Sequence, residues 1–394
     1  MAGLAAAGVA ALTGRRAPLR RVAAALRREF STPRVLLTDS GTSALIAALR
    51  LGVGKGNVVA VPGYTCFDVA SAVRFARVKA RVYDVDPYTL SPDLDSLDAA
   101  LGAGAKAVLV THLYGYPADM HAIAEVAQRH GALVIEDAAQ GIGATYDDKP
   151  LGAFGALSTL SFGRGKGMTG GRGGALLIND PRFDAVANDA TKALGAPAHG
   201  WSELFFGTAQ WMLGRPWLYG IPASIPSLHL GETVYHTAHE PRSMSAAAAG
   251  LVLRAPRELT GRVRIAEILT RAVEEGGYIA SIAVAEKGRP SYLRYAIVDS
   301  GRRMPSPGIG VLRGYPRSLA DLEAMRPALV GNEVALPGVN RLVNSLFTLP
   351  THGLVRTADL ENAIEWVRVP ARLMVDGRSE RDRAVKQADE IKMK

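Results

Sequence analysis

The chain has 394 residues, of which 48% are hydrophobic and 21% are charged, a balance typical of a globular protein with a sizeable core. This length accommodates two ordinary domains, or one large domain with a smaller one. A single cysteine, Cys66, excludes an intramolecular disulfide and any zinc cluster built on several cysteines, and it fits the reducing cytoplasm, where we expect the protein to work.

The net charge is +9, and much of the basic excess lies near the N-terminus. Between residues 15 and 34 the arginines face a single acidic residue, Glu29. Such a segment can attract nucleic acid, a membrane surface or phosphorylated substrates, but a solvated, arginine-rich helix is the simpler interpretation. We expect no nucleic-acid partner. Residues 2–12 are apolar but too short to cross a bilayer, and they lack the preceding positive charge of a secretory signal.

From Arg34 to Asp180, short apolar runs alternate with amphipathic segments. The β-branched runs predict buried strands at 35–38, 58–61, 80–85, 106–110, 132–137 and 175–178. Helices are predicted between them at 43–51, 67–76, 94–101 and 119–130. This order predicts an α/β fold with a mostly parallel central sheet and helices on both of its faces.

The organisation changes after residue 200. Residues 204–230 are apolar and rich in aromatic side chains, namely Phe205, Phe206, Trp211, Trp217 and Tyr219. Such a surface predicts an interface, either with a second subunit or, beside Arg215, with a membrane surface. A long helix or a broken pair is expected over 245–275, then a second α/β part that closes near Val367, and a charged tail from 376. We therefore place a large N-terminal domain at 1–235 and a smaller domain at 236–394.

Ligands of an open parallel sheet gather at the carboxyl ends of its strands, and three segments of suitable chemistry lie there. The first is Gly41-Thr42-Ser43, which opens a helix after the first strand. A helix N-terminus with glycine and hydroxyl groups suits a phosphate, although Ser or Thr also serves as an ordinary cap.

The second segment, Glu136 to Gln140, ends the strand at 132–137. A carboxylate at the tip of a buried strand caps the next turn or meets a cation, since it is costly to leave unpaired. The protonated pyridine nitrogen of pyridoxal 5′-phosphate (PLP) is such a cation, and Asp137 is the candidate partner. Gln140 is placed to donate a hydrogen bond to the phenolate oxygen of the same ring.

The third segment runs from Ser161 to Lys166 and continues into a glycine-rich stretch. A lysine among glycines and apolar residues is not a typical surface lysine, and a neutral amine there can attack an aldehyde. The rival interpretation is a nucleotide-binding P-loop. However, the leading glycine of that motif is missing, and Gly167 follows Lys166 where Ser or Thr is required.

Together these segments resemble the DegT/DnrJ/StrS family of sugar aminotransferases. The resemblance is continuous from about residue 34 to 180 and weaker afterwards. It is carried by SGTSAL (40–45), VPGYTC (61–66), THLYGYPADM (111–120), VIEDAAQ (134–140), SFGRGK (161–166) and GGRGGALL (170–177), with RSMSAAAAGLVL (242–253) and LFTLPTH (346–352) as later landmarks.

The resemblance implies a fold-type-I PLP enzyme that is a homodimer with its active site at the subunit interface. Lys166 would carry the cofactor as a Schiff base and move protons, Asp137 would pair with the pyridine nitrogen, and Gln140 would lie beside the ring oxygen. The phosphate would be held by Ser161, Gly41, Thr42 and Ser43. Dehydrating relatives have histidine at the lysine position, so Lys166 favours amino transfer.

Two features depart from the family pattern. Where many members have an aromatic residue that stacks on the PLP ring, this chain has Cys66, with Tyr64 two residues earlier, and both are candidates. An asparagine that precedes the R-M-S element in many members is absent, and Arg242 is a candidate substitute. We expect amino transfer from an amino acid, with glutamate as donor, to a keto-sugar nucleotide. The alternatives are a cyclitol aminotransferase, a sugar dehydratase and a non-catalytic PLP-binding regulator.

Overall fold

The computed structural model describes residues 16–168, 171–201, 204–205, 234–254, 259–277, 279–299, 303–331 and 334–369, together with Gly8. Its centre is a 7-stranded sheet in the order β1-β9-β8-β5-β4-β2-β3. The strands from β8 to β3 are parallel, and β9 runs antiparallel to both of its neighbours. The predicted mostly parallel sheet is therefore confirmed. The strands are β1 (Arg34–Thr38), β2 (Val58–Pro62), β3 (Lys79–Tyr83), β4 (Ala107–Thr111), β5 (Leu133–Asp137), β8 (Leu157–Ser161) and β9 (Gly174–Ile178).

The helices of this part begin where the sequence supplies caps. The side chains of Ser40, Asp93 and Asp119 each accept a hydrogen bond from a backbone N–H in the first turn of the following helix. The helices are α3 (Gly41–Gly52), α4 (Phe67–Ala76), α5 (Leu94–Gly102), α6 (Met120–Arg129) and α7 (Asp184–Ala193), with short 3-10 turns η1 (Leu113–Gly115) and η2 (Pro181–Phe183). The four helices predicted in the sequence up to residue 130 are thus present within about two residues.

Strand β8 was not predicted, and its composition explains why. Its sequence, LSTLS, interrupts the apolar run with polar residues, yet every one of its residues is buried. Ser158 and Thr159 tolerate burial because their hydroxyls donate to the carboxylates of Glu136 and Asp137 on the neighbouring strand β5. The strand that bears Ser161 is therefore specified by side-chain pairing across the sheet rather than by hydropathy.

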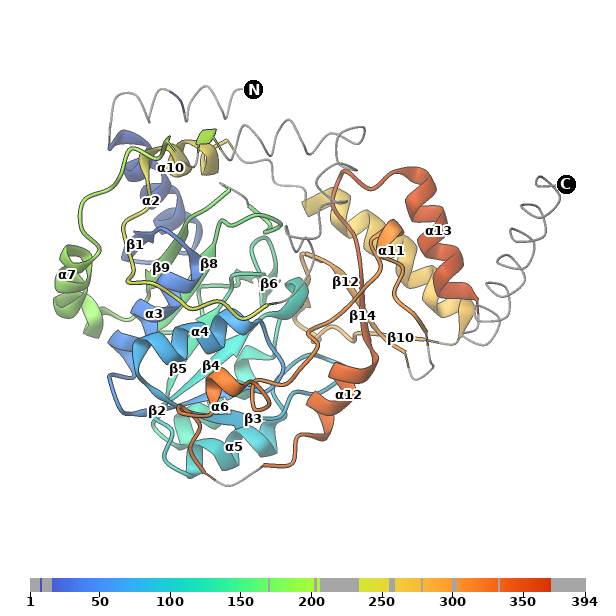
Figure 1. Cartoon of the computed structure of the whole chain (residues 1–394), viewed down its shortest axis with the longest axis horizontal. Helices are drawn as coiled ribbons and strands as arrows, with labels where there is room; N and C mark the ends of the chain where they lie inside the picture. The colour runs from blue at the N-terminus through green and yellow to red at the C-terminus, as the bar shows by residue number, and fades with distance from the viewer. Residues whose placement is uncertain are drawn as a thin grey trace, which may run out of the picture.

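The N-terminal basic segment forms α2 (Ala17–Glu29), which packs against α10 (Ala246–Val252) (Figure 1). Leu19, Val22 and Leu26 face the core, and the arginines of the last turn, Arg27 and Arg28, are exposed. The helix is therefore a solvated, arginine-rich one whose other face is structural. Across the part of the chain that is described, we find no helix with both the length and the apolar character needed to cross a membrane.

A second, 4-stranded sheet in the order β10-β12-β14-β13 is antiparallel throughout. It lies beside α11 and α13, which pack against each other (Figure 1), and Leu269, Ile297, Phe347 and Trp366 contribute to a core of its own. Its elements are β10 (Ala280–Ser281), β12 (Tyr295–Val298), β13 (Leu312–Arg313), β14 (Leu346–Leu349), α11 (Leu259–Gly276), α12 (Pro337–Ser345) and α13 (Thr357–Arg368), with turns η4 (Pro307–Ile309) and η5 (Glu323–Met325). The expected helix over 245–275 is the broken pair α10 and α11.

Several contacts join this second part to the first, and two of them involve regular elements of both parts. The buried carboxylate of Asp84, just after β3, accepts the N–H groups of Gly338 at 2.9 Å and Val339 at 2.8 Å, and so caps α12. A small sheet also pairs β11 (Gly288–Arg289) with β6 (Thr145–Tyr146), which pairs in turn with β7 (Lys149–Pro150). The domain boundary at residue 235 stays a prediction, because residues 206–233 lie outside the described ones, as does the charged tail. Of the aromatic side chains in 204–230, only Phe205 is described, and it is 70% exposed.

Candidate active site

A cavity of about 520 Å³ opens at the carboxyl ends of the parallel strands. It is bounded by the turn from β1 into α3, by the end of β5, and by the glycine-rich segment between β8 and β9. The sequence-predicted residues that line it are Gly41, Thr42, Cys66, Asp137, Gln140, Ser161 and Lys166. Ser43 and Tyr64 do not line it.

The anion-binding end of the cavity is the contact between α3 and β8. A Cβ atom added at Gly41 would lie 2.7 Å from the Cβ and 2.9 Å from the Oγ of Ser161, so only glycine permits this approach. The first turn of a helix has N–H groups without acceptors inside the helix, and Gly41 and Thr42 bring that turn to the cavity. The N–H of Ser43 is already bonded to the Oγ of Ser40, at 3.0 Å.

Two adjacent carboxylates, Glu136 and Asp137, stand at the end of β5 and have different environments. Glu136 is fully buried and accepts hydrogen bonds from many groups, so it is the residue that caps a turn. Its donors are the imidazole of His112, the hydroxyl of Ser158 and the backbone N–H groups of Gly152, Phe154 and Gly155. Burial opposes its ionisation, but the bonds from His112 and the backbone outweigh burial, and the pKa of Glu136 lies below its ordinary value.

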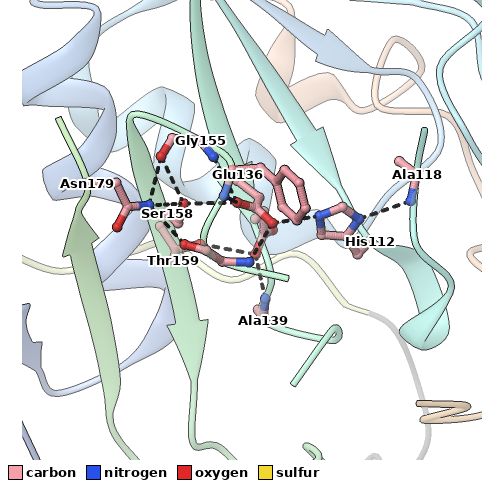
Figure 2. A network of polar contacts seen from close by, with 11 residues as sticks. His112, Ala118, Glu136, Ala139, Gly155, Ser158, Thr159 and Asn179 are labelled. Carbon is pink, nitrogen blue, oxygen red and sulfur yellow. Dashed lines mark hydrogen bonds and ion pairs between the residues drawn. The ribbon is translucent and has the colours of Figure 1, made fainter. Parts of the chain in front are cut away.

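The neighbouring His112 holds one tautomer. Its Nδ1 accepts the backbone N–H of Ala118 at 3.1 Å, so the proton resides on Nε2 and is donated to Glu136 at 3.0 Å. The backbone N–H of His112 also donates to the carbonyl of Asp137. This network, drawn in Figure 2, fixes the end of β5 from which Asp137 projects.

Asp137 faces the cavity. Its Oδ1 accepts bonds from the N–H of Ala139 at 3.0 Å and the hydroxyl of Thr159 at 3.1 Å, and Oδ2 accepts none from the described residues. Burial raises the pKa of Asp137, against the opposing effects of the Ala139 N–H and the positive charge of Lys166. The sequence left open whether a carboxylate at the end of this strand caps a turn or meets a cation. In the structure Glu136 caps a turn, and Asp137 is the one available to a cation.

Lys166 lies in the connection between β8 and β9. The two strands are paired up to Ser161 and Gly174, where this connection begins and ends. Positive φ values of +73° at Gly165 and +108° at Gly173 show why glycines are needed there. Lys166, Asp137 and Cys66 line the same cavity, and the positive charge of Lys166 partly opposes the rise that burial causes in the pKa of the other two. Thr169 and Gly170 lie outside the described part of this connection.

The two candidates for stacking are placed differently. Cys66 lines the cavity, and burial, helped by the carboxylate of Asp68, raises the pKa of its thiol to about 12. Tyr64 is fully buried behind the cavity, and its hydroxyl accepts the backbone N–H of Tyr315 at 2.8 Å. Cys66 therefore lines the cavity, whereas Tyr64 does not and contacts Tyr315 instead.

Sequence reasoning missed Asp68 and His239, which also line the cavity. Asp68 lies in the first turn of α4. A carboxylate directly after the sequence TCF, at the start of a predicted helix, could have indicated it as a site residue. His239 comes from a segment without secondary structure, and no periodicity marks it. Arg242 does not line this cavity; its backbone bonds to Asp39, and its side chain is exposed.

The model of the DegT/DnrJ/EryC1/StrS aminotransferase family matches residues 15–207. The match covers just under half of the chain, so this part of the chain is similar to the family. The resemblance found in the sequence is therefore confirmed.

Curated relatives match over little more than a third of the chain. The chain is 43% identical over 144 residues to an L-glutamine:2-deoxy-scyllo-inosose aminotransferase of Streptomyces kanamyceticus, which is 36% of this chain and 34% of that protein. It is 41% identical over 143 residues to a GDP-perosamine synthase of Caulobacter vibrioides, or 36% and 38% of the two chains. The matched parts span little more than a third of these relatives.

Solved structures match over nearly the whole chain. The aminotransferase TlmJ from Streptoalloteichus hindustanus has a TM-score of 0.72 at 24% identity, covering 93% of this chain and 95% of the other. DesV from S. venezuelae has a TM-score of 0.69 at 22% identity, with 92% of both chains covered. At these identities the likeness establishes the fold, which is that of fold-type-I aminotransferases.

Proposed function

We propose that this protein is a PLP-dependent aminotransferase that passes an amino group from an amino acid to a ketone on a sugar. The observation that carries the proposal is the convergence of three chemistries in one cavity. A helix N-terminus beside Ser161 suits a phosphate, the buried Asp137 suits a protonated pyridine nitrogen, and Lys166 suits an aldehyde. PLP has all three groups, so the residues present fit this cofactor.

The role of each residue follows from its surroundings. PLP, when bound, supplies an electron sink for a substrate carbanion. Asp137, the only one of the two β5 carboxylates that faces the cavity, would keep the pyridine nitrogen protonated. Ser161 and the first turn of α3 would hold the phosphate, and the amine of Lys166 would move a proton between donor and acceptor atoms as a general acid and base.

We propose a keto-sugar nucleotide as acceptor and glutamate as donor. Arg164 and Arg172 line the cavity and provide positive charge for a diphosphate. The alternative of a cyclitol acceptor is supported by one of the relatives, which is a 2-deoxy-scyllo-inosose aminotransferase. Another relative, 42% identical over 143 residues, is a pleiotropic regulatory protein of Geobacillus stearothermophilus. The simultaneous presence of Lys166 and Asp137 favours turnover over a purely regulatory role.

The two half-reactions test this function separately. Protein loaded with PLP is mixed with glutamate or glutamine, and loss of its visible absorption reports amino transfer to the cofactor. The aminated protein is then mixed with a panel of keto-sugar nucleotides and keto-cyclitols, and return of the absorption identifies the acceptor. Dehydration without transfer, or no change with any donor, would contradict the proposal.

We further propose a cytoplasmic homodimer, following the family resemblance. Sedimentation at low micromolar concentration, without detergent, tests the assembly. An active monomer would contradict the dimer, and a species that sediments only with lipid would favour the membrane alternative for residues 204–230.

A Gly41→Ala variant should bind PLP more weakly. The new Cβ would overlap Ser161, and because the backbone of β8 lies 3.3 Å away, the two elements must separate. Overpacking of this kind commonly costs about 1–3 kcal/mol, so we expect affinity to fall by roughly tenfold or more. Gly261→Ala, where nothing lies within 4 Å, is the matched control. Equal affinity of both variants, measured by titration with PLP, would show that the contact does not shape the phosphate site.

A further inference from the structure

The side-chain amide of Gln140 has a fixed orientation in the cavity wall. Its Oε1 accepts the backbone N–H of Tyr114 at 3.0 Å, and only an oxygen can do so. The amide nitrogen Nε2 must therefore point the other way, where one of its hydrogens is donated to the hydroxyl of Tyr315 at 2.9 Å. Nε2 has a second hydrogen, and Gln140 lines the cavity. That hydrogen is available to a ligand.

Tyr315 is itself held on several sides. Its backbone N–H donates to the hydroxyl of Tyr64 at 2.8 Å, and its ring stacks on that of Tyr114 with centroids 5.7 Å apart and planes at 18°. The ring of Tyr64 meets it edge-on at 5.4 Å. Gly314 precedes Tyr315 because an added Cβ would lie 1.9 Å from the Tyr64 hydroxyl.

Two features keep the partners of Gln140 in place. Tyr114 adopts the left-handed conformation, with φ of +55°, and this turns its N–H toward Gln140. Burial raises the pKa of Tyr315 well above its ordinary value, so the hydroxyl stays neutral and can accept the bond from Nε2.

We propose that Tyr315 is a positioning residue that aims the free N–H of Gln140 at the ring oxygen of the cofactor. This rests on the proposed function and adds a residue that lies 175 positions further along the chain, beyond the family match to residues 15–207. The segment after β13 in the second part of the chain thereby contributes to the cofactor site from behind its wall.

Tyr315→Phe removes the acceptor and keeps the ring. A hydrogen bond to the ring oxygen stabilises its anionic form, so the variant should raise the pH midpoint of the visible absorption of the PLP-loaded protein. We expect a rise of about half a unit to one unit, and a half-reaction with glutamate that is roughly tenfold slower. Gln140→Ala should raise the midpoint similarly, and the double variant should add nothing to it.

Tyr295→Phe is the matched control. Tyr295 is also a buried tyrosine, and its hydroxyl bonds to Thr270 of α11 at 2.9 Å and to Ser281 of β10 at 3.0 Å. It should lose stability without moving the pH midpoint. If Tyr315→Phe behaves as Tyr295→Phe does, or if its effect adds fully to that of Gln140→Ala, Tyr315 is only structural and the proposal is wrong.

Tyr64→Phe provides a second route if Tyr315→Phe does not fold. It removes the acceptor of the Tyr315 backbone N–H and should move the midpoint in the same direction by a smaller amount. No movement in Tyr64→Phe, together with a clear one in Gln140→Ala, would overturn the positioning role. A native protein that gains no visible absorption with PLP would instead overturn the proposed function itself, and this proposal with it.

Discussion

Lys166→Ala should lose nearly all amino transfer while leaving the fold and weak cofactor binding intact. Lys166 lies in a glycine-rich connection at the cavity, and no hydrogen bond or ion pair of its side chain to the described residues would be lost. Loss of a positioned general acid and base commonly reduces rates by roughly 10²–10⁴-fold. The half-reaction with glutamate, followed by stopped-flow absorbance, measures this directly.

The matched control for this variant is Lys55→Ala, at an exposed lysine outside the catalytic cavity, which should leave the rate unchanged. Borohydride reduction of the native protein loaded with PLP, followed by peptide mass mapping, should place the pyridoxyl group on Lys166. A label on another lysine, or on none, would contradict the assignment.

Asp137→Asn should lower the reaction rate with little change in stability, and Glu136→Ala should lower the stability, although the two residues are adjacent. Asparagine can still accept the bonds from Ala139 and Thr159, so Asp137→Asn should change the free energy of unfolding by less than about 1 kcal/mol. It removes the charge expected beside the pyridine nitrogen, and the rate should fall by roughly 100- to 1,000-fold.

Glu136→Ala removes the acceptor of three backbone N–H groups, a hydroxyl and His112, all in the interior. Breaking a buried pair of this kind typically costs about 3–5 kcal/mol. Urea unfolding of both variants, with the half-reaction rate of the folded fraction, separates the roles. If Asp137→Asn is the unstable variant and retains its rate, Asp137 caps a turn and the assignment of the two carboxylates is reversed.

Much of the first part of the fold could be predicted from local sequence. The strands at 58–61 and 106–110 are rich in valine and, apart from Lys106, apolar, and α5 and α6 begin at aspartate caps. Residues close together in the sequence therefore specify these elements. Strand β8 could not be predicted, because burial of Ser158 depends on an acceptor in β5. The two-residue strands of the second part are shorter than any periodic pattern.

The same distinction applies to the site. Asp137 and Ser161 end strands β5 and β8, Lys166 follows β8, and all three line one cavity, as the sequence predicts. Neighbouring residues do not show whether Tyr64 or Cys66 lines the cavity, because the position of Tyr64 depends on Tyr315, 251 residues further on. His239 likewise reaches the cavity through a long-range arrangement.

The pairing of β1 has a consequence for the order of folding during synthesis. Among the described strands its one neighbour is β9, so that Arg34 pairs with Ile178 and Thr38 with Gly174. The strand that leads into α3 therefore gains its partner only after β9 has been synthesised, and long-range pairings of this kind form slowly. Lys166 lies in the connection that is closed by the same strand. The anion-binding end of the cavity and Lys166 should thus become able to bind the cofactor at the same time, after the other parallel strands have been synthesised. A nascent chain that ends before β9 should therefore not retain PLP.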